Sequence, residues 1–458
     1  MAPGTQNGSE KAHLDTVDTT DEVKPFIVGE SKKDSEFGAP KDVYNAVYFI
    51  MLLHGIGCLM PWNMFITIAG KYFVGYKMLE RTDNGTLVET YYSTEFFGFL
   101  GMFSQLPNLL LNLINIFVRM RGGLKPRIAI SLCIVGAVCI FTMCFIFVDS
   151  NTWVFGFFVM TMFSVAILNG ANGVYQNSIY GVASAFPPKF TNAILIGNNI
   201  CGTFVSIISI LTILLSDDVR FAALFYFLVA FFTIVACLVS FFMLERFDFY
   251  VYYARKANQK NGDEEGQQQE EEHISMERYA EVLKQAWPQM FNVFCIFFVT
   301  LSIFPTIQVD IKLYREDGVY DFFIPQKLYE AITTFLLFNV CATIGSTLAN
   351  SYQWPNPKTL WIPVVLRLLL IPAFMFCNFR PAVRTWKVFF YNEWIFIVLS
   401  IIMAVSSGYL SSMGMMFAPH VVEPKNSRIA GMMAAFFLIF GVCCGILNTF
   451  VIGSVIEW

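Results

Sequence analysis

Long apolar stretches alternate with short polar stretches along most of this chain, and each apolar stretch has the length of a helix that crosses a membrane. A span needs about 20 mostly apolar residues. By this length criterion the pattern predicts about eleven spans. They start near Tyr44, Glu95, Arg127, Thr152, Phe190, Phe221, Trp287, Leu328, Leu360, Trp394 and Arg428.

Composition supports a membrane protein. Hydrophobic residues make up 56% of the 458 residues and charged residues 14%, and the mean hydropathy is +0.57. A soluble domain needs more charge on its surface, and the 49 phenylalanines cannot all be buried in one aqueous core. The sequence therefore predicts an all-α polytopic membrane protein with eleven transmembrane helices.

Polar segments divide the chain into four parts. Residues 1–43 read as a disordered tail, because they are polar and rich in Asp, Glu, Gly, Ser and Thr. Residues 44–245 carry six predicted spans and residues 287–458 carry five. The charged linker 246–286 between them contains the run DEEGQQQEEEH, which cannot bury enough apolar area to fold. We expect two helix bundles joined by a flexible strap.

Basic residues predict the orientation in the membrane, since Lys and Arg favour cytoplasmic loops. The loops at 119–127 and 246–284 are basic and lie inside if the amino terminus is cytoplasmic, whereas the basic loop 380–387 argues more weakly for the opposite. An odd number of spans then places Trp458 outside. Asn84 opens an N-x-T acceptor in the first outer loop and is expected to carry a glycan at the plasma membrane.

No motif predicts catalysis or a cofactor. The 11 cysteines are scattered without zinc spacing, and no G-x-S-x-G, H-E-x-x-H or P-loop pattern is present. We expect no enzyme activity, no metal site, no cofactor and no nucleic-acid partner. The sequence leaves the oligomeric state open.

Polar groups inside the spans are the candidates for function, because they are costly in hydrocarbon. The densest set is NGANGVYQNSIYG, residues 169–181, where helical spacing places Asn169, Asn172 and Gln176 on one face. Other spans contribute further amides and hydroxyls: Gln105, Asn108, Asn112, Asn339, Thr343 and Ser346. Either these groups line a cavity for a neutral, hydrogen-bonding solute, or they tie helices together.

The stretch HGIGCLMPWNMF, residues 54–65, combines several signals in the first span. Its two glycines suit close approach of a neighbouring helix. Trp62 lies near mid-span, where the indole would either stack on a planar ligand or pack in the interior. His54 is the one histidine within a span and is either a proton site or, as we favour, a neutral hydrogen-bonding group. Arg367 in the ninth span is expected to snorkel or to pair with a carboxylate at a cytoplasmic gate.

Several motifs together make the chain similar to the equilibrative nucleoside transporter family. The match runs from Tyr44 onward, and the segments that carry it are GIGCLMPWNMFIT, YQNSIYGVASAFPPKFTNAILIGNNICG, the FP pair in the seventh span, RLLLIPAFMFCN, SSGYLSS and PKNSRIAGMMAAFFLIFG. The resemblance implies a major-facilitator-like fold of six plus five helices. It also implies facilitative transport of nucleosides by alternating access, with the substrate at mid-membrane between the bundles.

The resemblance also assigns roles to individual residues. Trp62 would contact the base and Gln176 would hydrogen-bond its edge. The remaining lining residues would be Gln105 and Asn108 in the first bundle and Phe304, Phe335, Asn339 and Val442 in the second. Ile66 and Pro305 would meet at the outer gate.

One departure from the family pattern bears on the substrate. The eighth span of the family usually carries an Asp and, one turn later, an Arg that hold the ribose, and Ala342 and Ser346 stand at these positions here. Ser346 would still hydrogen-bond a hydroxyl. Nucleobases and organic cations therefore remain alternative substrates, and a membrane receptor or scaffold that no longer transports remains an alternative function.

Overall fold

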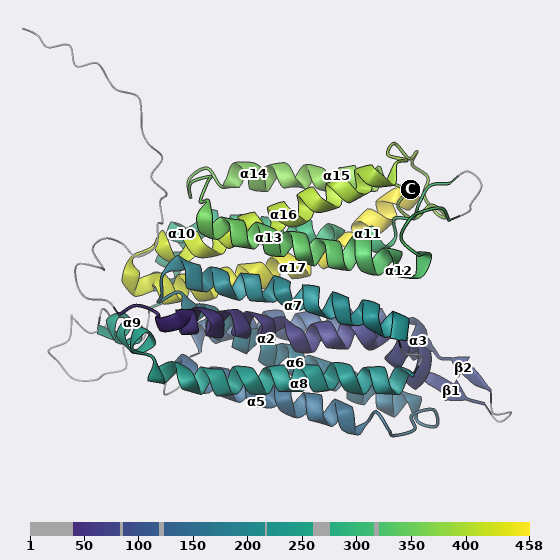
Figure 1. Cartoon of the computed structure of the whole chain (residues 1–458), viewed down its shortest axis with the longest axis horizontal. Coiled ribbons are helices and arrows are strands. Elements are labelled where there is room, and N and C mark those ends of the chain that lie inside the picture. The colour runs from purple at the N-terminus through teal and green to yellow at the C-terminus, as the bar shows by residue number, and fades with distance from the viewer. Residues whose placement is uncertain (1–39, 83–85, 119–122, 216–217, 260–274, 316–319) are drawn as a thin grey trace, which may run out of the picture.

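A computed structural model describes residues 40–82, 86–118, 123–215, 218–259, 275–315 and 320–458, which form an almost entirely helical molecule (Figure 1). The first group of elements is η1 (Val43–Asn45), α2 (Ala46–Ile68), the π-helical η2 (Ala69–Lys77), β1 (Leu79–Arg81), β2 (Leu87–Glu89), α3 (Tyr91–Thr94), α4 (Phe96–Phe117), α5 (Leu124–Cys144), α6 (Val154–Ala183), α7 (Pro188–Leu215), α8 (Val219–Met243), η3 (Leu244–Arg246) and α9 (Asp248–Gln259). The second group is α10 (Met276–Ile303), α11 (Thr306–Val309), α12 (Gln326–Glu330), the π-helical η4 (Ala331–Leu336), α13 (Leu337–Ser351), α14 (Trp361–Leu366), η5 (Arg367–Leu369), α15 (Leu370–Met375), α16 (Glu393–Phe417), η6 (Ala418–His420), η7 (Pro424–Asn426) and α17 (Ser427–Glu457).

The predicted spans are present as helices. Within the described residues, ten helices are long and apolar enough to cross a membrane. The ninth predicted span is the shorter apolar helix Trp361–Met375, which η5 interrupts at Arg367. It has a proline near each end, at Pro363 and Pro372, and proline limits how far a regular helix extends.

The helices pack in two groups, which Figure 1 shows side by side. In the first group α2 packs along α7, and α4 packs along α6; in the second, α10 packs along α17, and α13 packs along α16. The groups touch where α17 meets α4 and α6 and where α7 meets α13 and α16. Most of the buried side chains of the first group form one continuous hydrophobic core, which side chains from the amino-terminal halves of α10 and α17 join.

Opposite ends of the molecule carry different elements. The antiparallel pair β1–β2 and the carboxyl terminus lie at one end, and α9 lies at the other (Figure 1). This arrangement agrees with a linker and a carboxyl terminus on opposite sides of the membrane. Which end faces the cytoplasm stays a prediction from the basic residues.

The linker 246–286 contains more helix than its composition predicts. Its first part forms α9, and α10 begins at Met276 rather than near Trp287. The aromatic face of α9 explains its order: the ring centroid of Phe249 lies 4.9 Å from that of Phe190, and Phe249 and Tyr253 are buried. The acidic run 263–273 lies outside the described residues.

The basic loop after α15, which argues against the predicted orientation, is held by local partners. Arg380 pairs with Asp310 at 3.1 Å and with Glu457 at 2.8 Å, and Gly453 leaves room for its guanidinium against α17. Arg384 donates to backbone carbonyls, including that of Cys377 at 2.6 Å, and burial there lowers the pKa of its guanidinium. These arginines therefore have structural partners where the sequence shows only positive charge.

Candidate substrate site

Trp62 lies in α2 directly after Pro61 and is half-buried. Its indole is nearly parallel to the ring of Phe65, with the centroids 6.5 Å apart and an interplanar angle of 4°. Phe65 in turn stacks on Phe73 at 4.6 Å. The plane of the indole is therefore fixed by neighbours while part of its surface stays accessible, as stacking on a planar ligand requires.

The glycines around Trp62 allow α2 and α7 to touch through their backbones. A Cβ on Gly55 would overlap the carbonyl oxygen of Ile194, and a Cβ on Gly197 would overlap that of Leu52. The prediction that the glycines of the HGIG stretch allow close approach of a neighbouring helix is confirmed. Asn63 adds a weak contact between the same helices, because its amide donates to the Sγ of Cys201 at 3.6 Å.

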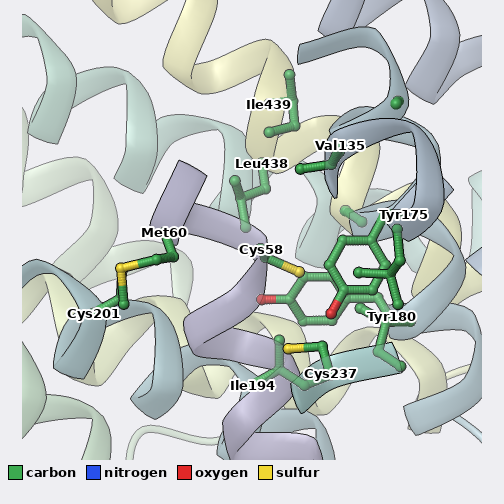
Figure 2. Close-up of a cluster of buried hydrophobic side chains, with 14 of the residues drawn as sticks. Cys58, Met60, Val135, Tyr175, Tyr180, Ile194, Cys201, Cys237, Leu438 and Ile439 are labelled. Atoms are coloured by element: carbon green, nitrogen blue, oxygen red, sulfur yellow. The ribbon is translucent and has the colours of Figure 1, made fainter. Parts of the chain in front are cut away.

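His54 belongs to the interior of the first helix group. Its Nδ1 lies 2.6 Å from the hydroxyl of Tyr175, and its ring packs edge-on against Phe241. Figure 2 shows Tyr175 with the thiols of Cys58 and Cys237 beside it in the buried core. This environment agrees with the interpretation of His54 as a hydrogen-bonding group between α2 and α6.

Three amide oxygens in α4 and α6 are buried and have no hydrogen-bond partner within the described residues: Asn108 Oδ1, Asn172 Oδ1 and Gln176 Oε1. Asn108 lies against Gly173, where a Cβ would be 2.6 Å from its side-chain oxygen, so α4 and α6 approach closely. A buried acceptor without a partner costs about 1–3 kcal/mol. A ligand donor or a water molecule is the expected partner of these oxygens.

Gln105 of α4 and Val442 of α17 lie on two helices, one from each group, that touch each other. The thiol of Cys443, next to Val442, lies 3.8 Å from the Oε1 of Gln105. Val442 is half-buried and packs against the core of the first group. The structure thus brings two predicted lining residues from different helix groups to one junction.

The other predicted lining residues of the second group form an aromatic cluster. Phe304 stacks on Phe338 with the centroids 3.9 Å apart and meets the ring of Phe335 edge-on at 5.8 Å. The amide of Asn339 donates to the carbonyl of Phe335 at 2.9 Å, and its Oδ1 lies directly over Gly202 of α7. Asn339 is therefore at the boundary between the two groups, whereas Phe304 and Phe335 pack mainly within their own group.

Ser346 is fully buried, and protein partners already occupy its hydroxyl. The Oγ accepts from the amide of Asn199 at 2.8 Å and donates to the carbonyl of Gly408 at 3.1 Å. One turn earlier, the backbone of Ala342 lies against Gly408. In this conformation the O–H donor of Ser346 is used and one acceptor lone pair remains, so the expected hydrogen bond to a substrate hydroxyl stays a prediction.

Arg367 departs from its predicted environment. Its guanidinium is buried, and its hydrogen bonds go to the carbonyl of Ile296 at 3.0 Å, to Thr300 Oγ1 at 2.9 Å, to Met403 O at 3.3 Å and to Ser406 Oγ at 3.1 Å. The expectations of snorkelling and of a carboxylate partner are wrong, because four neutral oxygens of α10 and α16 surround the guanidinium inside the second group. A gate role for Arg367 stays a prediction.

The outer gate at Ile66 and Pro305 and the glycan on Asn84 remain predictions. Ile66 and Pro305 are half-buried at the positions expected to form the outer gate. The glycosylation acceptor Asn84 lies outside the described residues.

Several asparagines to which the sequence assigned no individual role join helices, in agreement with the alternative that amides tie helices together. Asn177, next to Gln176, donates to Asn112 Oδ1 at 2.9 Å and to the carbonyl of Met432 in α17 at 2.8 Å. In α7, Asn192 and Asn199 bond residues of α13. Their spacing of seven residues, two helical turns on one face, was a usable signal.

Comparison with known proteins identifies the family. A family model described as "Nucleoside transporter" matches residues 162–454, well over half of the chain. The chain belongs to the nucleoside transporter family. Its members are transporters, which confirms the expectation that this protein is not an enzyme.

Several relatives resemble this nucleoside transporter over most of their length. Human equilibrative nucleoside transporter 1 is 28% identical over 462 residues, which cover 91% of this chain and 99% of the relative. Human equilibrative nucleoside transporter 2 is 29% identical and covers 89% of this chain and 96% of its own.

Solved structures confirm a major-facilitator-like fold. The proton:xylose symporter XylE, a member of the major facilitator superfamily, superposes with a TM-score of 0.60 at 10% identity and covers 90% of this chain and 87% of that chain. The human organic anion transporter MFSD10 gives 0.54 at 13% identity, over 90% of this chain and 95% of that chain. At these identities the likeness concerns the fold alone.

Proposed function

We propose that this nucleoside transporter moves nucleosides down their concentration gradient, by alternating access between the bundles 44–245 and 287–458. The observation that carries the proposal is the set of buried amide oxygens without partners on Asn108, Asn172 and Gln176. They lie in α4 and α6, the helices of the first group that touch α17 of the second. Acceptors of this kind suit the N–H donors of a nucleobase.

The proposed lining residues come from both helix groups and have different roles in binding. Trp62 stacks on the base and Gln176 hydrogen-bonds its edge, with Gln105 and Asn108 beside it. Across the junction, Val442, Asn339 and the aromatic pair Phe304 and Phe335 line the cavity, and Ile66 and Pro305 close it on the outside.

The charges inside the bundles support uncoupled transport of a neutral solute. Among the described residues, the buried charged side chains are the cationic Lys77, Arg127 and Arg367. Cationic groups disfavour the binding of sodium or an organic cation, which seek carboxylates. We therefore rank an organic-cation carrier below a nucleoside carrier.

The protein is proposed to act at the plasma membrane, with a cytoplasmic amino terminus, an extracellular carboxyl terminus and a glycan on Asn84. A glycosidase should lower the apparent mass of the wild type and leave Asn84→Gln unchanged. A glycosidase shift that persists in Asn84→Gln would remove the support for this site.

A nucleobase carrier is the second candidate, because Ala342 offers no polar group and the hydroxyl of Ser346 is engaged by Asn199 and Gly408. These two positions therefore offer few free hydrogen-bonding groups to the hydroxyls of a ribose. A receptor or scaffold without transport is the third candidate.

Counterflow in proteoliposomes that contain the purified full-length protein separates these functions. Labelled uridine and adenosine should exchange against unlabelled nucleoside, and a competition panel should rank nucleosides above free nucleobases. Stronger competition by nucleobases would favour the second candidate. The absence of counterflow with any nucleoside or nucleobase would overturn transport and leave the receptor.

A further inference from the structure

The seam between α7 and α13 joins the two helix groups through side-chain amides. We use "the α7–α13 seam" for Asn192 and Asn199 of α7 with Ser346 and Asn350 of α13. Asn192 Nδ2 donates to the backbone carbonyl of Ser346 and to Asn350 Oδ1, both at 2.8 Å. Asn199 Nδ2 donates to Ser346 Oγ at 2.8 Å.

The partners fix the direction of each bond. A backbone carbonyl only accepts, so Asn192 must present its NH₂ group to Ser346. The carbonyl of Gly408 takes the hydroxyl proton of Ser346 at 3.1 Å, so the Oγ must accept from Asn199. The seam is therefore a directed set of bonds in which α7 supplies the donors and α13 the acceptors.

The seam lies at the end of the molecule that carries α9. Asn192 is in the first turns of α7, just after Phe190, which packs on Phe249 of α9. Asn350 is in the last turn of α13, and its side-chain amide also donates a hydrogen bond to the hydroxyl of Tyr48 at the start of α2.

We propose that the α7–α13 seam is a latch that holds the transporter closed at the α9 end and that must open for solute to pass there. The inference rests on the alternating access of the proposed function. Neutral amides suit a reversible contact, because each bond that breaks on opening is replaced by a bond to water. Closer to the middle of the helices, Gly202 lets Asn339 lie directly on α7, so the groups also fit sterically when the latch is closed.

The test measures the distance between the helix groups at the α9 end. Spin labels are attached at Lys189→Cys and Ser351→Cys, two exposed positions that flank the seam. The accessible thiols of Cys133, Cys144 and Cys444 are replaced by serine, and the full-length protein is reconstituted in nanodiscs. The parent should show mainly the short distance of the closed seam.

Loss of the seam amides should raise the long-distance population. Hydrogen bonds between membrane helices are weak, so each one removed should change the ratio of open to closed roughly threefold. Asn192→Ala with Asn199→Ala removes all three amide bonds of the seam and should change the ratio roughly 30-fold. Ser346→Ala should give a smaller shift, because the backbone carbonyl still binds Asn192. Asn198→Ala is the matched control, since Asn198 bonds Tyr180 within its own group at 3.4 Å and should keep the parent distribution.

The outcomes separate the latch from the proposed function. An unchanged distance distribution in both the double variant and Ser346→Ala, with counterflow intact, would overturn the latch alone. A distance distribution that does not change when nucleoside is added, together with the absence of counterflow, would overturn alternating access itself. If the double variant does not fold, Ser346→Ala and the single asparagine variants decide the question.

Discussion

At the scale of single residues, partners rather than residue types separate function from structure. Gln176 and Asn177 are adjacent in α6, yet Asn177 has three amide or carbonyl partners, while Gln176 Oε1 is buried without one among the described residues. His54 and Trp62 belong to one short stretch of α2. His54 is bonded to Tyr175 in the interior, whereas Trp62 keeps part of its ring accessible. A side-chain amide therefore joins helices at position 177 and has an acceptor free for a ligand at position 176.

Replacement of Trp62 by alanine should weaken substrate binding much more than surface expression. Stacking of an aromatic side chain on a base is worth about 1–3 kcal/mol, so KM should rise roughly fivefold or more. Initial rates of uridine uptake against concentration measure this. Trp153→Ala, which removes an indole at a span end, is the control and should keep the wild-type KM. Wild-type kinetics in Trp62→Ala would show that the indole packs in the interior and does not stack on the substrate.

Replacement of Gln176 by alanine should change the preference among bases. A site that hydrogen-bonds its substrate discriminates by leaving a polar group unpaired when the wrong substrate binds. The ratio of KM for adenosine to KM for uridine should shift about tenfold or more. Asn169→Ala on the same helix is the control, because the amide of Asn169 donates within its own helix, to the carbonyl of Val165. An unchanged ratio in Gln176→Ala would make Gln176 structural.

At the scale of elements, small residues set which helices touch. The α2–α7 pair forms because Gly55 and Gly197 let the two backbones meet, with α7 positioned to carry Asn192 and Asn199 toward α13. Helix α9 is ordered for a different reason, since Phe249 on its aromatic face packs against Phe186 in the turn before α7 and against Phe190 in the first turn of α7. Helix α7 therefore contacts the glycines of α2, the aromatic face of α9 and the residues of α13 that form the seam.

Gly197→Ala should destabilise the protein, because its methyl group would overlap the carbonyl oxygen of Leu52. Overpacking of this kind costs about 1–3 kcal/mol. Thermal unfolding followed by size exclusion should show a Tm lowered by several degrees. Gly101→Ala in α4 is the control, because a Cβ there meets nothing within 4 Å, and its Tm should stay the same or rise slightly. Equal Tm values for the two variants would contradict the tight α2–α7 contact.

At the scale of the whole molecule, two helix groups meet along two junctions, α17 with α4 and α6, and α7 with α13 and α16. The first junction holds the buried amide oxygens of Asn108, Asn172 and Gln176, and the second holds the seam amides, where Asn192 Oδ1 also has no partner among the described residues. The proposed lining residues reach both junctions, since Asn339 lies on Gly202 of α7, and the proposed latch belongs to the second.

Uncoupled transport makes a prediction about direction. A carrier driven only by its substrate cannot accumulate it, so Vmax/KM for influx and for efflux should be equal in proteoliposomes, within about twofold, whatever the kinetics of each step. Imposed proton or sodium gradients should not change the final internal concentration. Accumulation above the external concentration in a proton gradient would contradict uncoupled transport. Loss of that accumulation in His54→Ala would identify His54 as the proton site.

The sequence by itself determined the helices, because a run of about 20 apolar residues has few alternatives to a span. It also determined the packing notch at Gly55, and its motifs indicated the family. It did not determine the order in the linker, the neutral surroundings of Arg367 or the engagement of Ser346, since each depends on residues far away in the chain. Whether an asparagine binds substrate, ties a bundle or latches two bundles is decided only by which helix lies opposite it. That choice is made by tertiary packing, because amide side chains have the same hydrogen-bonding groups in every role.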